Sequence, residues 1–285
     1  MLVVLVITCI VAVLVVALTR SGTEAFDGGV DAAVIGGSPA SYADFPFYCD
    51  VGGCGGVLIA PDVVLTAAHC KSSRPGTNVV VGGGKDTVKV KRIAFNSMME
   101  RLVRVGLTDQ ATDQQTINFY TSFVSNDLKL LRLERAVRGV KPIPLATSHP
   151  RDGTATLIIG RGKQTYTGSS SGAFMKAWLP YRKPENAVQL IEAENAANFG
   201  GQLYKNISKS IAASRAVVTT VSFDRRSGCH GDSGGPLVIP NRGRWELLGI
   251  VSSGPVNCNQ NMKKSHFSMF VSVPFHRAWI AASSS

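Results

Sequence analysis

The sequence predicts an all-β fold, either a barrel or a sandwich, on two observations. From Val34 onward, short runs of β-branched and apolar residues alternate with clusters of Gly, Pro, Ser and Asn, a spacing typical of many short strands joined by turns. Long helical periodicity is rare, with candidates only at residues 186–198 and 276–282. The expected strands are 56–60, 63–67, 78–81, 87–93, 129–133, 155–159, 237–239, 247–251 and 267–273.

The length and composition fit an ordered globular protein. The 285 residues, 45% of them hydrophobic, suffice for one large β domain or for two ordinary domains. The Lys141-Pro-Ile-Pro segment indicates a connection between two halves, one from residue 34 to about 140 and one from about 141 to 285. We therefore expect the chain to divide at this connection.

Residues 1–25 predict a secretory signal peptide. The first 18 positions are almost unbroken Leu, Val, Ile and Ala, and small residues stand at Thr23 and Ala25, before the expected cut. No Lys or Arg precedes this run, and its length lies at the lower limit for a membrane span, so an uncleaved signal anchor is the alternative. We expect a secreted, extracellular protein that meets a membrane only if this segment stays uncleaved.

Five of the six cysteines lie beyond the signal segment, at positions 49, 54, 70, 229 and 258. No CxxC pair occurs, so we expect neither zinc binding nor thioredoxin-like redox chemistry. The pattern indicates an oxidising compartment and disulfides. Because five is odd, at least one thiol stays free or pairs outside the chain.

The chain is strongly basic, with 30 Lys and Arg against 19 Asp and Glu and a formal net charge of +11. These basic residues are scattered and no nucleic-acid motif accompanies them, so we expect a solvated basic face and no nucleic-acid partner. The sequon at Asn206 is a potential glycan acceptor in a eukaryotic secretory pathway.

The segment Gly228–Leu237 surrounds Ser233 with glycines. Glycine removes side chains from around the hydroxyl and allows positive φ, so that backbone N–H groups can point at a bound group. This arrangement favours a nucleophile with an oxyanion hole. The alternative is a glycine-rich surface turn.

Two further segments carry side chains that suit such a nucleophile. His69 follows an apolar strand and precedes Cys70, and a bridge from Cys54 to Cys70 would close a loop worth about 3 kcal/mol. Asp127 stands at the head of the apolar run Leu128–Leu131, where a cap or turn aspartate is the ordinary interpretation.

The motifs VLTAAHC, NDLKLL, GDSGGPL and GIVSSG follow one another in this order. Together they resemble the trypsin and chymotrypsin-type serine endopeptidases, over roughly residues 34 to 280. The resemblance implies two six-stranded antiparallel β-barrels, the active site in the cleft between them, and a short C-terminal helix. It also implies peptide-bond hydrolysis through an acyl-enzyme intermediate, with no cofactor and no metal.

The resemblance assigns the catalytic triad to His69, Asp127 and Ser233. Ser233 is a weak nucleophile until His69 takes its proton, while Asp127 fixes the ring tautomer and stabilises the imidazolium. The backbone N–H groups of Gly231 and Ser233 would form the oxyanion hole, a contribution of roughly 3 to 4 kcal/mol per donor.

Activation is also implied by the resemblance. Val34-Ile-Gly-Gly resembles the N-terminus created by cleavage, whose new amino group pairs with the acid beside the nucleophile, here Asp232. Residues 26–33 would then be a short propeptide. Because the residue before the cut is Ala33 rather than Lys or Arg, we do not expect a trypsin-like activator.

The specificity pocket can be assigned by the same resemblance. Ser227 would form its base, Gly254 an open wall, and Ser268 a narrower wall, while the main chain of Ser252 and Gly254 would pair with the substrate. No acid stands at the base, so we expect apolar side chains to be preferred over Lys and Arg. A disulfide between Cys229 and Cys258 would brace this pocket.

Some positions depart from the family pattern. Ser253 replaces an aromatic residue, Arg161 replaces a tryptophan, and His230 lies beside the pocket entrance. Cys49 has no family partner and is expected as a free thiol or an intermolecular bond. The segment 97–118, between His69 and Asp127, is longer than is usual in the family, which predicts a loop at the rim of the cleft.

Two rival functions follow from the same residues. Gly231–Gly235 also fits the G-x-S-x-G elbow of an α/β-hydrolase, but after Ser233 only Glu246 precedes His266 and His276, which argues against that esterase fold. The other rival is a catalytically silent homologue that acts as a binding protein.

For the enzyme we expect protein or peptide substrates, a protein inhibitor as a further partner, and a monomeric state.

Overall fold

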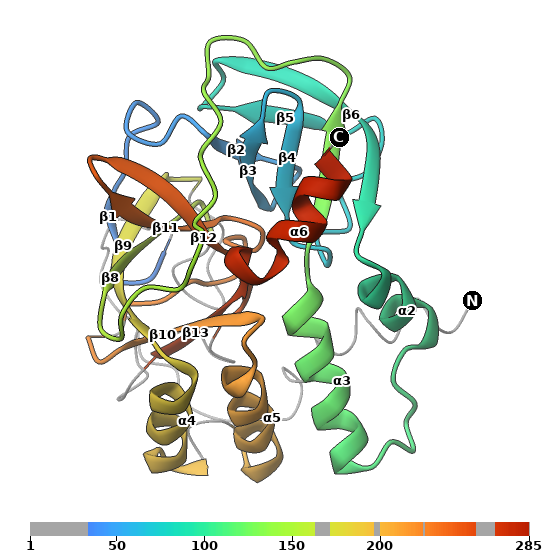
Figure 1. Ribbon diagram of the computed structural model, residues 1–285, viewed down its shortest axis with the longest axis vertical. Coiled ribbons are helices and arrows are strands. Elements are labelled where there is room, and N and C mark those ends of the chain that lie inside the picture. The colour runs from blue at the N-terminus through green and yellow to red at the C-terminus, as the bar shows by residue number, and fades with distance from the viewer. Residues whose placement is uncertain (1–33, 163–171, 197–199, 225, 255–265, 285) are drawn as a thin grey trace, which may run out of the picture. The chain divides into compact units, whose positions relative to one another are not determined.

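The computed structural model describes residues 34–162, 172–196, 200–224, 226–254 and 266–284 (Figure 1). The predicted signal peptide and propeptide, residues 1–33, lie outside these ranges. The predicted disulfide partner Cys258 lies outside them as well.

Six antiparallel strands form a first closed barrel, in the order β2-β3-β4-β7-β6-β5. Along β6, buried Val88 and Val90 alternate with exposed Lys89, the two-residue period of a strand with one face in a core. The strands are β2 (Tyr48–Asp50), β3 (Gly55–Ala60), β4 (Val63–Thr66), β5 (Asn78–Val81), β6 (Asp86–Phe95) and β7 (Lys129–Leu133).

Six further strands form the second barrel, in which β8 pairs with both β9 and β11 and so closes the sheet. The strands are β8 (Ala155–Gly160), β9 (Met175–Arg182), β10 (Val217–Ser222), β11 (Pro236–Asn241), β12 (Arg244–Ser253) and β13 (His266–Ser272). The prediction of two six-stranded antiparallel barrels is confirmed. A short strand, β1 (Ser38–Pro39), adds to β9, although we had expected this part of the chain in the first half.

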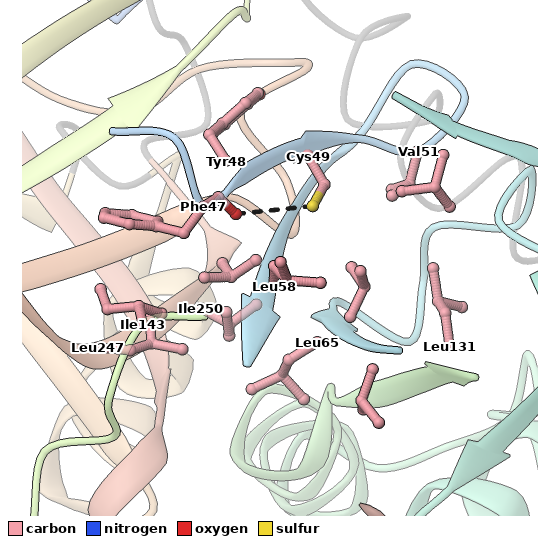
Figure 2. Close-up of a cluster of buried hydrophobic side chains, with 14 of the residues drawn as sticks. Phe47, Tyr48, Cys49, Val51, Leu58, Leu65, Leu131, Ile143, Leu247 and Ile250 are labelled. Carbon is pink, nitrogen blue, oxygen red and sulfur yellow. Dashed lines mark hydrogen bonds between the residues drawn. The ribbon is translucent and has the colours of Figure 1, made fainter. Parts of the chain in front are cut away.

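The core of the first barrel continues into the second. Figure 2 shows Leu58 of the first barrel beside Ile250 of β12, in the same cluster of buried side chains as Leu65, Leu131 and Leu247. The burial of apolar side chains in such a core is the main stabilising contribution in a β domain.

Cys49 lies inside this core. Its side chain is fully buried, and Sγ lies 3.6 Å from the carbonyl oxygen of Phe47 (Figure 2). It is the free cysteine of the described residues, and burial raises the pKa of its thiol well above the usual range. Of the two predicted states, the structure therefore has the free thiol, sealed from solvent.

The helices α3 (Asp113–Asn126), α4 (Pro184–Ala193) and α5 (Gln202–Ala213) form a layer beside the second barrel, and α2 (Ser97–Val105) packs against α3 (Figure 1). The predicted helix at 186–198 overlaps α4. The prediction of a cleft-rim loop at 97–118 was wrong, because this region holds α2 and the start of α3. Asn96 caps α2 through a hydrogen bond from Met99 N, and Thr112 forms a capping box with Gln115.

These helices have their own apolar core. Ile191 of α4 and Ile207 of α5 pack in one cluster with Val124 of α3 and with Val221 and Met269 of the second barrel. The layer is thus anchored on β10 and β13. Within the described ranges, no helix has the length and apolar character that a membrane crossing requires.

The last helix, α6 (Val273–Ser284), returns to the first barrel. Val273 and Ile280 are buried in the first-barrel core, and Arg132 of β7 donates a hydrogen bond to the carbonyl oxygen of Ser284. The predicted C-terminal helix is confirmed and is longer than the expected turn at 276–282.

The substitution Ile191→Ala tests whether the helical layer is part of the cooperative fold. Ile191 is fully buried, so truncation should lower the free energy of unfolding by about 2–5 kcal/mol. Urea unfolding followed by circular dichroism measures this loss. Gln189→Ala, at an exposed position of the same helix, should change stability by less than about 0.5 kcal/mol. Equal effects of the two substitutions would contradict the packing described above.

Candidate active site

The best-defined polar contact of the predicted site joins His69 and Asp127. His69 Nδ1 lies 2.6 Å from Asp127 Oδ2, and the His69 backbone N–H donates to Asp127 Oδ1 at 2.9 Å. An ionised carboxylate only accepts hydrogen bonds, so Nδ1 carries the proton and Nε2 is left as the basic nitrogen. The pair therefore has the tautomer that a general base needs.

Asp127 is fixed from both barrels. It directly follows α3, whose last residue is Asn126, and it precedes β7 of the first barrel. Ser252 of β12 in the second barrel donates through Oγ to Asp127 Oδ2 at 2.7 Å. The carboxylate is completely buried, so these hydrogen bonds replace the water that it has lost.

The environment of His69 favours its protonated form. Burial lowers the pKa of the ring, but the charge of Asp127 and the hydrogen bond to it outweigh burial, while Lys129 opposes them, and the pKa is raised overall. The side chain remains 29% exposed, in contrast with the fully buried Asp127. Solvent can therefore reach the ring, as a reacting base requires.

Close packing brings the Ser233 segment against the His69 segment. At Gly234, φ is +77°, and a Cβ there would lie 2.2 Å from Thr66 Oγ1 and 3.1 Å from Ala67 N. Only glycine fits this position without displacing the end of β4. This close contact holds the Ser233 segment against the end of β4, which leads to His69.

A disulfide strengthens this contact. Cys54 and Cys70 are bonded, and Cys70 Sγ lies 3.8 Å from the carbonyl oxygen of Ser233. The same carbonyl accepts a 2.8 Å hydrogen bond from Gly55 N. Among the residues that the structure describes, no hydrogen bond joins Ser233 Oγ to the His69 ring, so the backbone, rather than the hydroxyl, holds Ser233 in place.

The backbone around Ser233 leaves two N–H groups available. Asp232 N donates to Cys229 O, and Gly234 N donates to Val251 O. For Gly231 and Ser233, no acceptor occurs in the described part of the chain. Gly231 has φ +96°, which a residue with a side chain rarely adopts. These are the two donors that the sequence predicts for an oxyanion hole.

Asp232 is buried beneath the same loop. Its Oδ1 accepts from Gly162 N at 2.8 Å and its Oδ2 from Cys229 N at 2.9 Å. Desolvation by burial outweighs these two hydrogen bonds and raises the pKa of Asp232 to about 7. In the described residues no cation pairs with this carboxyl.

The predicted activation segment lies close to Asp232. Val34 is fully buried in the second-barrel core, and Ile35 forms two backbone hydrogen bonds with Ser227. Ile35 also packs against Cys229, whose N–H donates to Asp232. Val34 has φ +58°, a strained conformation for a β-branched residue.

The predicted pocket base is polar and buried. Ser227 is fully buried, and its Oγ lies 3.2 Å from Nδ1 of His266, which begins β13. Ser268 Oγ accepts a 3.4 Å hydrogen bond from Gly228 N. A Cβ on Gly254 would lie 3.2 Å from Gly228 O, so both predicted walls lie against Gly228.

Several site residues were not predicted. Lys129 is buried next to the His69 segment and His266 next to Ser227, and neither was assigned a role from the sequence. Arg161, noted only as a departure, donates to Asp50 Oδ2 at 2.9 Å and so links the two barrels. Cys229 is disulfide-bonded. No group of three or more metal-ligating side chains is found within the described ranges.

Comparisons with known proteins agree with this geometry. The family model described as Trypsin matches residues 34–280. Trypsin of Sarcophaga bullata is 28% identical over 242 residues, which cover 80% of this chain and 77% of that protein. Chymotrypsin-like elastase family member 3B of Homo sapiens is 28% identical over 218 residues, which cover 75% of this chain and 73% of that protein.

A solved structure shows the same fold. Neuropsin, a serine protease expressed in the limbic system of mouse brain, superposes with a TM-score of 0.63 at 22% sequence identity. The match covers 88% of this chain and all of the neuropsin chain. With the family-model match over most of its length, this chain belongs to the trypsin family of serine proteases.

Proposed function

We propose that this chain is an active serine endopeptidase that hydrolyses peptide bonds through an acyl-enzyme intermediate. The observation that carries the proposal is the contact between His69 Nδ1 and the fully buried Asp127 carboxylate at 2.6 Å. This contact leaves Nε2 free to accept a proton, in a ring that solvent can still reach.

Ser233 is the nucleophile of this reaction. Its hydroxyl transfers a proton to His69 Nε2 while Oγ attacks the carbonyl carbon of the substrate. Protonated His69 then gives the proton to the leaving amine, and water releases the acyl group by the same route. Asp127 stays ionised and stabilises the protonated ring throughout.

The oxyanion of each tetrahedral intermediate is bound by the N–H groups of Gly231 and Ser233. Both donors lack an acceptor within the described ranges, so they need no rearrangement of an existing hydrogen bond when charge develops. Such donors typically contribute roughly 3 to 4 kcal/mol each.

The pocket built on Ser227 accepts apolar or aromatic side chains in preference to Lys and Arg. Its described base holds two serines and His266, with no acid that could pair with a buried cation. Ile158 and Val251 approach Gly228 and add apolar surface. The main chain of Ser252 and Gly254 pairs with the substrate strand.

Cleavage between Ala33 and Val34 activates the enzyme. The cut removes the peptide bond that defines the strained φ of Val34, and it creates an amino group next to Ile35, which packs against Cys229, the donor to the buried Asp232 carboxyl. Their pairing would order the Gly231–Ser233 loop. Secretion before this step, with residues 1–25 as a signal peptide and 26–33 as the propeptide, completes the proposal.

Hydrolysis of peptides tests the proposal directly. Protein that begins at Val34 should cut fluorogenic substrates with Phe or Leu before the cleaved bond at least about tenfold faster than those with Arg, because no acid faces a cation in the pocket. Ser233→Ala should lower kcat by about 10⁴-fold or more. Ala and Glu substrates complete the panel, since His266 lies at the base of the pocket.

The outcomes of this assay separate the alternatives. Cleavage of Arg substrates at the highest rate would contradict the assignment of Ser227 as a neutral pocket base. Failure of every substrate, together with failure of a fluorophosphonate probe to label Ser233, would indicate the silent homologue that acts as a binding protein.

The stability of the uncleaved chain should depend on the titration of Asp232. A carboxyl whose folded pKa is about 7, raised from 3.8, stabilises the fold while it is protonated and loses that contribution as pH rises through about 7. Between pH 5 and pH 8 we expect the free energy of unfolding to fall by about 2 kcal/mol from this group. Urea unfolding at both pH values measures the difference.

Matched variants isolate this effect. Asp232→Asn should remove the loss between pH 5 and pH 8, whatever its effect on absolute stability, whereas Asp44→Asn, at an exposed position, should retain it. The cleaved protein should also lack the loss, because the new amino group supplies a charged partner. An identical pH dependence in Asp232→Asn and in the unchanged chain would refute the role of this carboxyl.

A further inference from the structure

Lys129 is a buried lysine beside the predicted catalytic pair. It begins β7, two residues after Asp127, and is only 2% exposed. Lysine is almost never buried to this extent without a partner. Its Nζ donates to the carbonyl oxygen of Cys70 at 2.6 Å and lies 5.7 Å from the centre of the Phe95 ring.

The partners of Lys129 are neutral. Within the described residues, no carboxylate lies within 4.0 Å of its ammonium, so a carbonyl oxygen and an aromatic face replace water around the charge. Neutral partners compensate the burial of a charge only in part. A methionine of similar length would avoid this cost, so the fold does not require an ammonium here.

The position of Lys129 couples it to His69. Asp127 lies two residues before Lys129 in the turn between α3 and β7, close enough for its charge to act on the ammonium. Asp127 accepts hydrogen bonds from the backbone and ring of His69, and Lys129 donates to the next residue, Cys70. Asp127 and Lys129 therefore hold two consecutive residues of the His69 segment, His69 itself and Cys70.

The charges in this cluster act in opposite directions. Asp127 raises the pKa of His69, whereas the positive charge of Lys129 lowers it. Burial lowers the pKa of Lys129 itself to about 8, with a partial compensation from Asp127. The neighbouring strands add no further charge at this point, because β4 pairs Thr66 and β6 pairs Phe95 with Lys129.

We propose that Lys129 is a positioning residue of the His69–Asp127 pair: its buried ammonium, hydrogen-bonded to the carbonyl oxygen of Cys70, fixes the chain directly after His69. Because its positive charge also lowers the pKa of the ring, Lys129 extends the pH range in which His69 acts as a base to lower values. The consequence for catalysis rests on the proposed peptidase function, whereas the effect on the ring does not.

Two substitutions separate the charge of Lys129 from its hydrogen bond. Lys129→Gln keeps an N–H donor without the charge, and Lys129→Met removes both. The matched control is Lys205→Met, which removes another buried lysine that donates to a backbone carbonyl, Glu192 O at 2.8 Å, in the helical layer. Lys129→Arg keeps the positive charge and serves as the conservative rescue.

The readout is the pKa of His69, measured by NMR titration of its ring in each variant of the full chain. We expect this pKa to rise in Lys129→Gln and Lys129→Met and to stay unchanged in Lys129→Arg and Lys205→Met. In the protein beginning at Val34, the acid limb of the kcat/KM profile should move in the same direction, with a loss of about threefold or more at pH 6 relative to pH 8.

The two measurements distinguish the two proposals. An unchanged His69 pKa in both Lys129→Gln and Lys129→Met overturns the role of Lys129, whether or not the protein cuts peptides. A raised His69 pKa in a protein that cuts no peptide supports the role of Lys129 and refutes the peptidase. If Lys129→Met does not fold, Lys129→Gln, which keeps an uncharged N–H donor at this position, decides the question.

Discussion

The arrangement of the two barrels at the site depends on the hydrogen bonds that the buried carboxylate of Asp127 accepts. It accepts hydrogen bonds from His69 in the first barrel and from Ser252 in the second, and it has no exposure to water. A charge in such a place is stable only while its donors stay in position. The positions of β12, of the end of α3 and of the turn after β4 must therefore all be correct at the same time.

Asp232 presents the opposite case within the same fold. Its two donors are backbone N–H groups of Gly162 and Cys229, and burial still keeps the pKa of its carboxyl near 7. A side chain at Gly160, the last residue of β8, or at Gly162 would collide with Asp232. A Cβ on Gly162 would lie 2.6 Å from Cγ of Asp232. The donors to Asp127 thus include the side chains of His69 and Ser252, whereas Asp232 is enclosed by backbone and pairs with no cation among the described residues.

The strand-rich pattern and the four motifs were enough to predict the barrels and the positions of His69, Asp127 and Ser233 along the chain. They could not reveal α3 or α5, because α3 contains β-branched and aromatic residues that weaken its helical signal and its stability comes from tertiary packing. From the sequence alone, a lysine such as Lys129 at the start of a strand is expected to face solvent. His266 and Ser227 stand 39 positions apart, so only the closed barrel shows that they meet.

Each end of the described chain packs against the barrel that is more distant from it in the sequence. β1 pairs with β9 of the second barrel before the chain enters the first, and α6 leaves the second barrel to bury Val273 and Ile280 in the core of the first. Neither barrel can lose its structure without also releasing a segment of the other. The consequence is a single cooperative unfolding transition, in place of the independent melting that two barrels joined by one linker would show.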